Sequence, residues 1–206
     1  PFALIGRTRE SAGLTFADQD FDETAHIAIG HLASLGHGVV AFVNGPDRLL
    51  TSGYGATVRA DAAMRSAAAA AGVQLVSTPC EHDVSAGRSL LDELIAKGGV
   101  TGIVAMNDEA TIGFVHQARH RGVRIPEDLS VLSVSASAER AEMTSPALST
   151  ISPQAGEIGR AAARALISTL VDDPAISEPV LWAGTLVERG STAPAAATGK
   201  SRAFLS

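Results

Sequence analysis

The sequence predicts an α/β protein built on an open, mostly parallel sheet with helices on both faces. Short apolar runs alternate along the chain with longer amphipathic or alanine-rich runs. The clearest apolar run, Val39–Val43, has no polar residue, which is typical of a strand buried on both faces of a parallel sheet. A repeated strand–helix order joins parallel strands through helical crossovers, so the helices are expected to cover both faces.

The elements follow one another in this order. The candidate strands are Phe2–Ile5, Leu14–Ala17, Val39–Val43, Val73–Ser77, Gly102–Met106, Leu129–Val134 and Val180–Val187. Helices are expected over about 22–35, 57–71, 84–97, 109–120 and 154–171, from the spacing of their apolar residues. Gly36, Gly72 and Gly122 follow three of these helices, where a left-handed residue often ends a helix. A Gly-, Ser- and Thr-rich loop is expected before residue 57.

Composition excludes several classes of protein. Hydrophobic residues make up 46% of the 206 residues and charged residues 18%, which indicates a globular chain with a real core. The net charge of −6 and the lack of basic clusters argue against nucleic-acid binding by this segment itself. A single cysteine indicates a reducing compartment. No apolar run is long enough to span a membrane, and the strand at the very start suggests missing upstream sequence.

The usual signatures of enzymes are absent. The sequence contains no dinucleotide fingerprint, phosphate loop or nucleophile elbow. His116 and His120 have the spacing of metal ligands on one helical face, but a solvated face is the better interpretation. Cys80 is interpreted as a passive thiol. Asp18 and Asp20 are either paired carboxylates or, preferably, part of a turn beside a strand end. We therefore expect no catalytic residue, metal or cofactor.

The ends of the predicted strands indicate where a ligand site belongs. In open parallel sheets, ligands bind outside the carboxyl ends of the strands. The residues that follow those ends are Asn44–Pro46, Ser77–Asp83, Asn107–Asp108 and Ser135–Ser137.

Several ordered segments resemble the effector-binding core of LacI-family transcriptional regulators. They are Pro1–Arg7 (PFALIGR), His31–Pro46 (HLASLGHGVVAFVNGP), Ile103–Gly113 (IVAMNDEATIG), Ile125–Val131 (IPEDLSV), Pro146–Ile151 (PALSTI) and Leu186–Thr192 (LVERGST). The resemblance implies a fold like that of periplasmic binding proteins, with two doubly wound lobes that close on a ligand. It also implies that the start of the first lobe and the DNA-binding helix-turn-helix part are missing here.

The resemblance also implies a division of the chain. Residues 1–20 and 152–175 would form the partial N-terminal lobe, and residues 21–151 and 176–192 the C-terminal lobe. Residues 193–206 would be a loose tail. The chain would cross between the lobes near residues 20, 152 and 175, and these crossings would form the hinge.

Two residues carry the predicted effector site. Arg59 matches the family arginine that contacts the effector, and its planar fork of five donors suits hydroxyls, a carboxylate or a phosphate. Its alternative is a surface arginine of an alanine-rich helix. Asn107 matches the family asparagine at a strand end, where an amide can donate to and accept from one sugar. The amide can also cap the next helix, although we expect Asp108 to be that cap.

Two other positions depart from the family pattern. Val84 stands where relatives often have an aromatic platform, and Ser135 where an aspartate commonly binds effector hydroxyls. These departures leave room for an anionic or smaller ligand. Tyr54, in a loop over 47–58 that is longer than usual, is a candidate for the missing aromatic contact. Arg7 and Gln154 are further candidates, with a solvent-exposed turn as the alternative for Arg7.

The resemblance finally implies partners. Ile112, Val115 and Met143 match positions that pack between subunits in relatives, which predicts a homodimer; core packing is the alternative. The leading hypothesis is the sensing core of a cytoplasmic regulator that binds a sugar-like effector and operator DNA, the latter through the missing part. A periplasmic solute-binding protein that serves a sugar transporter is the alternative. A sugar hydrolase or kinase would need an acid–base pair or phosphate loop, which the sequence does not show.

Overall fold

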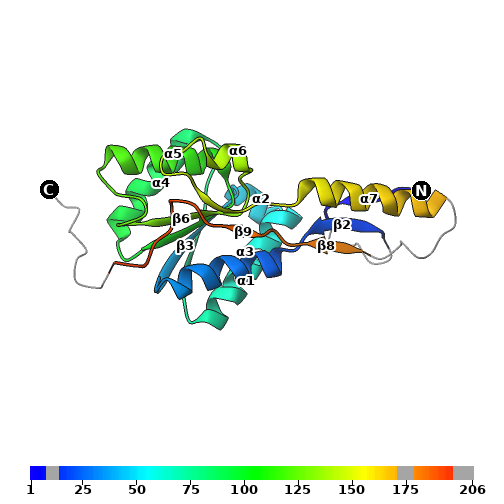
Figure 1. Cartoon of the computed structure of the whole chain (residues 1–206), viewed down its shortest axis with the longest axis horizontal. Coiled ribbons are helices and arrows are strands. Elements are labelled where there is room, and N and C mark those ends of the chain that lie inside the picture. The colour runs from blue at the N-terminus through cyan, green and yellow to red at the C-terminus, as the bar shows by residue number, and fades with distance from the viewer. Residues whose placement is uncertain (8–13, 171–178, 197–206) are drawn as a thin grey trace.

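The computed structural model describes residues 1–7, 14–170 and 179–196. Within these ranges the strands form two sheets, a larger one of six strands and a smaller one of three. The molecule is elongated. The smaller sheet and its helix α7 (Ala155–Leu170) extend from one side of the larger sheet (Figure 1).

The larger sheet has the strand order β4-β3-β5-β6-β7-β9. All neighbouring strands are parallel except β7 and β9, which are antiparallel. The chain runs outward from β3 to β4 and then returns to the other side of β3 at β5. The order therefore reverses between β3 and β5, and this reversal is where open α/β sheets place their ligands. The bounds are β3 (Val39–Asn44), β4 (Gln74–Pro79), β5 (Gly102–Ala105), β6 (Ser130–Ser133), β7 (Ser149–Ile151) and β9 (Leu186–Val187).

Helices cover both faces of the larger sheet, as Figure 1 shows. The helices are α1 (Phe21–Ser34) and α3 (Gly55–Ala71) on one face, and α4 (Val84–Lys97), α5 (Asp108–His120) and α6 (Ala138–Ala141) on the other. Side chains of β3 alternate between the two layers: Val40 and Phe42 pack with α1 and α3, whereas Ala41 and Val43 pack with α4 and α5. Burial on both faces explains why this strand is apolar throughout.

The smaller sheet has the order β1-β2-β8, with all strands parallel. Its strands are β1 (Leu4–Ile5), β2 (Phe16–Gln19) and β8 (Val180–Trp182). Helix α7 packs against it through Ile158 and Ala162, which are buried with Ala17 of β2. The predicted fold class, α/β with two parallel sheets, is confirmed.

The structure corrects two of the predicted segments. The loop predicted over 47–58 contains helix α2 (Asp47–Thr51), and α3 begins at Gly55. Asp47 lies in the first turn of α2, where its negative charge interacts favourably with the positive end of the helix dipole. The second strand runs to Gln19, so Asp18 lies inside β2 and not in a turn. Asp20 is the cap of α1, where its side chain accepts from the amide of Glu23.

The single strand predicted over Val180–Val187 is wrong, because this segment belongs to both sheets. β8 pairs with β2 in the smaller sheet, and β9 pairs with β7 in the larger one. The third crossing therefore lies between Trp182 and Leu186, while the predicted boundary at 175 is outside the described residues. A Cβ on Gly184 would lie 2.5 Å from the carbonyl oxygen of Ser152, so two crossing segments touch at a glycine.

Glycines also hold α4 and α5 in close contact. A Cβ on Gly87 would lie 1.9 Å from the carbonyl oxygen of Ala110, and one on Gly113 would lie 2.0 Å from that of Val84. The backbones of the two helices therefore meet directly, which only glycine permits. This pair of contacts fixes the start of each helix against the other.

The described part of the predicted tail is attached to the larger sheet. Ala193 accepts from the ring of His37 and exchanges hydrogen bonds with Ser130, while the amide of Ala195 donates to Leu35. The prediction of a loose tail is thus wrong for residues 193–195, and 197–206 lie outside the described residues. No helix in the described ranges has the length and apolar character needed to cross a membrane.

Candidate functional site

Two asparagines mark the point where the strand order reverses. Asn44 ends β3 and Asn107 follows β5, so both lie at the carboxyl ends that a ligand would face. The amide of Asn44 donates to the carbonyl of Thr57 at 3.1 Å, and its oxygen accepts from the amide of Gly45 at 2.8 Å. Asn44 therefore ties the start of α3 to the end of β3.

The side chain of Asn107 makes three hydrogen bonds to neighbouring parts of the fold. Its Oδ1 accepts from the amide of Ala110, and its Nδ2 donates to the carbonyls of Cys80 and Glu81, each at 3.1 Å. We call these four residues the strand-end group. Asn107 is only 2% exposed. It has the extended backbone that an N-cap requires, so the expectation that Asp108 is the cap is wrong.

A second polar cluster joins the two sheets. Asp18 of β2 accepts from Nε of Arg7 and from Nη2 of Arg59, both at 3.0 Å and both on the same oxygen, Oδ2. Nη1 of Arg59 also donates to the carbonyl of Arg7 at 3.2 Å. We call Arg7, Asp18 and Arg59 the arginine group. Arg59 belongs to α3, which packs on the larger sheet, and Asp18 belongs to the smaller sheet. This group therefore joins the two sheets directly, and each sheet with its helices is called a lobe below.

The residues around Arg59 give its guanidinium an aromatic contact and the space that it needs. The group lies over the ring of Phe21, 5.5 Å from its centroid. A Cβ on Gly55 would lie 2.6 Å from Nη1, so the start of α3 leaves room for the side chain. Burial lowers the pKa of Arg59, and the nearby carboxylate of Asp18 acts in the opposite direction. Among the described residues, Nε of Arg59 has no hydrogen-bond partner although it is buried.

Asp18 is the residue of this cluster that sequence reasoning missed. A buried carboxylate requires a paired cation or several donors. Asp18 is 7% exposed, and the two arginines meet this need. The signal in the sequence was a charged residue directly after the apolar start of a strand. It was interpreted as the end of that strand.

The structure places the other predicted effector residues on four separate segments of the chain. The hydroxyl of Ser135 donates to Asp108, whose carboxylate is also 3.7 Å from Arg140. Tyr54 is exposed directly before the first residue of α3. Val84 is partly exposed at the start of α4. Gln154 is half-buried in the crossing before α7.

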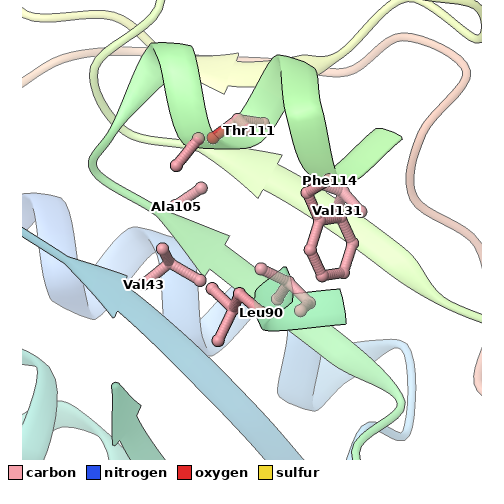
Figure 2. Close-up of a pocket in the computed structure, with 8 residues that line it drawn as sticks. Val43, Leu90, Ala105, Thr111, Phe114 and Val131 are labelled. Carbon is pink, nitrogen blue, oxygen red and sulfur yellow. The ribbon is translucent and has the colours of Figure 1, made fainter. Parts of the chain in front are cut away.

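A small gap lies in the core next to the strand-end group, with which it shares Ala110. It is enclosed by β3, β5, β6, α4 and α5, and Figure 2 shows the side chains around it. Thr111 is the one polar residue of its lining, and the hydroxyl of Thr111 donates to the carbonyl of Asn107 at 2.6 Å. An apolar gap without a free polar group cannot orient a polar ligand. We interpret it as imperfect packing. The lining consists of Val43, Leu90, Ile103, Ala105, Ala110, Thr111, Phe114 and Val131.

The described residues offer little to metal or thiol chemistry. No cluster of three His, Cys, Asp or Glu side chains suited to a metal ion occurs in the described ranges. Cys80 is buried, and burial raises the pKa of its thiol to about 11. The reactive thiolate is therefore scarce at neutral pH.

Comparison with known proteins identifies the family. The sequence profile described as "Periplasmic binding protein-like domain" matches residues 13–192. The chain belongs to this family. An uncharacterized HTH-type transcriptional regulator in the aml 5′ region of Streptomyces limosus is 31% identical over 203 residues. That match covers 94% of this chain and 55% of the relative, so the chain spans a little over half the length of that regulator.

Solved structures agree with this assignment. A LacI family transcriptional regulator from Bifidobacterium animalis subsp. lactis superposes with a TM-score of 0.85 at 28% identity, over 95% of this chain and 70% of that one. One from Enterococcus faecalis, solved with bound ribose, superposes with a TM-score of 0.78 at 25% identity, over 94% of this chain and 69% of that one. The predicted resemblance to the effector-binding part of LacI-family regulators is confirmed.

The structure divides the residues that were matched to the LacI-family dimer interface. Val115 is 6% exposed and lies in the core cluster beneath α5, so it offers almost no surface to a partner. Its assignment to an interface is corrected to the alternative of core packing. Met143 is 70% exposed, and Ile112 is half-buried on α5. These two remain candidates for a subunit contact.

Proposed function

We propose that this domain senses a sugar or sugar derivative at the junction of its two lobes. The observation that supports it most directly is the bond from Arg59 on the larger sheet to Asp18 on the smaller sheet. A ligand that engages Arg59 at this place changes a contact between the lobes, and therefore their relative orientation. The junction also lies beside the strand ends where open α/β sheets bind ligands.

The chemistry of the junction suits a polyhydroxylated ligand. Guanidinium donors pair with adjacent hydroxyls or with an anionic group. The relative from Enterococcus faecalis was solved with bound ribose, which supports a sugar-like effector for this chain. Ser135, Tyr54, Gln154 and Val84 are proposed to line the ligand from the surrounding elements, and Asn107 to face it from the strand end.

We further propose that the domain works within a longer regulator. Relatives such as the one from Streptomyces limosus are named HTH-type transcriptional regulators and extend well beyond the matched region. Ligand binding here would then modulate operator binding by a helix-turn-helix part, in the cytoplasm and in a homodimer that uses Ile112 and Met143. A solute-binding protein shares the fold, but the names of the relatives favour a regulator. Met143→Glu should make a dimeric protein monomeric in sedimentation.

A thermal-shift screen tests the sensing function. A true effector raises the melting temperature through mass action, because it binds only the folded state. We expect one or more sugars, sugar acids or sugar phosphates to do so, and Arg59→Ala to abolish the rise. Arg65→Ala is the matched control, since Arg65 lies on the same helix and pairs with Asp61. A shift that survives Arg59→Ala, or turnover of the ligand by the pure protein, would contradict the proposal.

A further inference from the structure

The arginine group carries more positive than negative charge. Two guanidinium groups from different elements converge on one carboxylate, and both donate to the same oxygen of Asp18. The second oxygen of that carboxylate accepts from the amide of Gln19 at 2.8 Å. The backbone of β2 therefore holds Asp18 so that it offers only one oxygen to the two arginines.

This geometry leaves Arg59 incompletely paired. Arginine and a carboxylate or phosphate prefer two parallel hydrogen bonds, one to each oxygen. Asp18 does not provide this arrangement, and Nε of Arg59 stays buried without a partner among the described residues. A buried donor without a partner has a cost, most of all on a charged group. A simple structural ion pair would not require such an unsatisfied nitrogen.

The start of α3 supplies an independent sign that this place is adapted to Arg59. A Cβ on Gly55 would lie 3.0 Å from the carbonyl oxygen of Arg7 and 2.6 Å from Nη1 of Arg59. A side chain at position 55 would push the guanidinium away from the smaller sheet. The glycine thus allows the guanidinium to lie against both lobes.

We propose that the effector carries a carboxylate or phosphate group that replaces Asp18 between Arg7 and Arg59. This inference rests on the proposed sensing function and specifies its ligand as an anionic sugar derivative. Asp18 acts as an internal competitor, which occupies the arginines until an anion with two free oxygens displaces it. Displacement replaces the direct bond between β2 and α3 with a bridge through the ligand, from Arg7 of the smaller lobe to Arg59 of the larger one, so ligand binding changes how the two lobes are held together.

Inorganic phosphate tests the anion site without any assumption about the sugar. In Asp18→Asn the two arginines lose their counter-charge, while the shape of the side chain is kept. We expect phosphate at about 20 mM, compared with chloride at equal ionic strength, to raise the melting temperature of this variant by about 3 °C. The double variant Asp18→Asn/Arg59→Gln should show no such rise. Equal responses of the two variants would overturn the inference.

Matched sugars then test the ligand class by calorimetric titration. The probes are ribose, ribonate and ribose 5-phosphate, which share a scaffold and differ in charge. Ribonate or ribose 5-phosphate, whichever presents the preferred anion, should bind the unmodified chain and bind Asp18→Asn about tenfold more tightly. Arg59→Gln should abolish binding, and the exposed Arg65→Gln should leave it unchanged.

The outcomes separate this inference from the function on which it rests. Binding of ribose that equals or exceeds that of both charged probes overturns the anionic ligand but leaves a sugar sensor. Stabilisation of Asp18→Asn by phosphate, without binding of any ribose compound, supports the anion site with another scaffold. If no sugar in the wider thermal-shift screen binds and phosphate has no effect, both proposals fail.

Discussion

The strand-end group and the arginine group both bury polar side chains near the ends of strands, but they differ in how completely these side chains are bonded. The side chain of Asn107 makes three hydrogen bonds, one to α5 and two to the loop between β4 and α4, so all of them stay within the larger lobe. Arg59 instead reaches from the larger sheet to the smaller one, and its buried Nε has no partner in the described part of the chain. The strand-end group is fully hydrogen-bonded within one lobe. The arginine group joins two lobes and keeps one buried donor without a partner among the described residues.

This difference separates a rigid frame, by which we mean the larger sheet with its helices and loops, from the arginine group, which can respond to a ligand. A buried amide with every partner in place is expensive to disturb, because each lost bond leaves a desolvated group behind. A charged pair that joins two lobes gains less, because desolvation of both ions offsets much of their attraction. Stability should therefore depend strongly on the frame and weakly on the arginine group.

The largest loss of stability is expected where the backbones of α4 and α5 are in direct contact. Gly87→Ala places a methyl group 1.9 Å from the carbonyl oxygen of Ala110, so α4 and α5 must separate. We expect the free energy of unfolding to fall by about 3 kcal/mol, the upper range for overpacking. Urea unfolding followed by circular dichroism measures it.

Gly30→Ala is the matched control for this prediction. Gly30 lies in α1, and a Cβ there would meet nothing within 4 Å. Alanine is the better helix former, so this variant should gain about 0.5–1 kcal/mol. If Gly87→Ala were as stable as Gly30→Ala, the direct contact of α4 with α5 would be wrong.

The next largest effect is expected at Asn107. Asn107→Ala leaves two carbonyls, of Cys80 and Glu81, and the amide of Ala110 without this partner. We expect a loss of about 2–3 kcal/mol in the free energy of unfolding. The exposed cap Ser137 of α6 is the control, and Ser137→Ala should cost about 1 kcal/mol or less. Equal losses would show that burial of the cap adds nothing.

The sequence predicted the frame well because apolar patterns carry most of the information about buried strands and helices. Val39–Val43 was recognised from its composition alone, and the strand-end rule led to Asn107. Two segments failed for physical reasons. Val180–Val187 is continuous in sequence, but the close contact at Gly184 splits it between two sheets. The segment over 47–58 is rich in loop-forming residues, yet it contains a helix.

The arginine group was predictable only in part. Arg59 and Arg7 were both named, Arg59 from its family position and Arg7 from its place after the first strand. Their joint partner, Asp18, was interpreted as part of a turn, because a charged residue inside a short strand is unusual. Only the three-dimensional pairing shows that two distant cations compensate this carboxylate. Such pairing joins residues 11 and 41 positions apart, which local patterns cannot encode.

A smaller, pH-dependent effect on stability is expected at His37, whose two ring nitrogens both have hydrogen-bond partners in the larger lobe. Its ring nitrogens contact the hydroxyl of Thr101 at 3.0 Å and the carbonyl of Ala193 at 3.1 Å. Burial lowers the pKa of His37 below the value near 6.5 that it has when unfolded. The unfolded chain therefore binds this proton more readily, and folding stability should fall as pH drops below about 6.5.

The free energy of unfolding measured at pH 7.5 and at pH 5.5 tests this prediction. The unmodified chain should be less stable at pH 5.5, and His37→Gln should show a smaller difference between the two conditions. If His37→Gln kept the full difference, other groups would be responsible for the pH dependence.

The smallest effect on stability is expected at Arg59, which is the sharpest test of the comparison. Arg59→Gln leaves Asp18 paired with Arg7 and removes the buried nitrogen that lacks a partner. The side chains of both arginines are also 24% exposed, so solvent screens the pair. We expect urea unfolding to show a loss of less than about 1 kcal/mol. A loss of about 3–5 kcal/mol, as expected for a broken structural ion pair, would place Arg59 in the frame. A small loss of stability together with lost ligand binding would show that Arg59 serves ligand binding and contributes little to the stability of the fold.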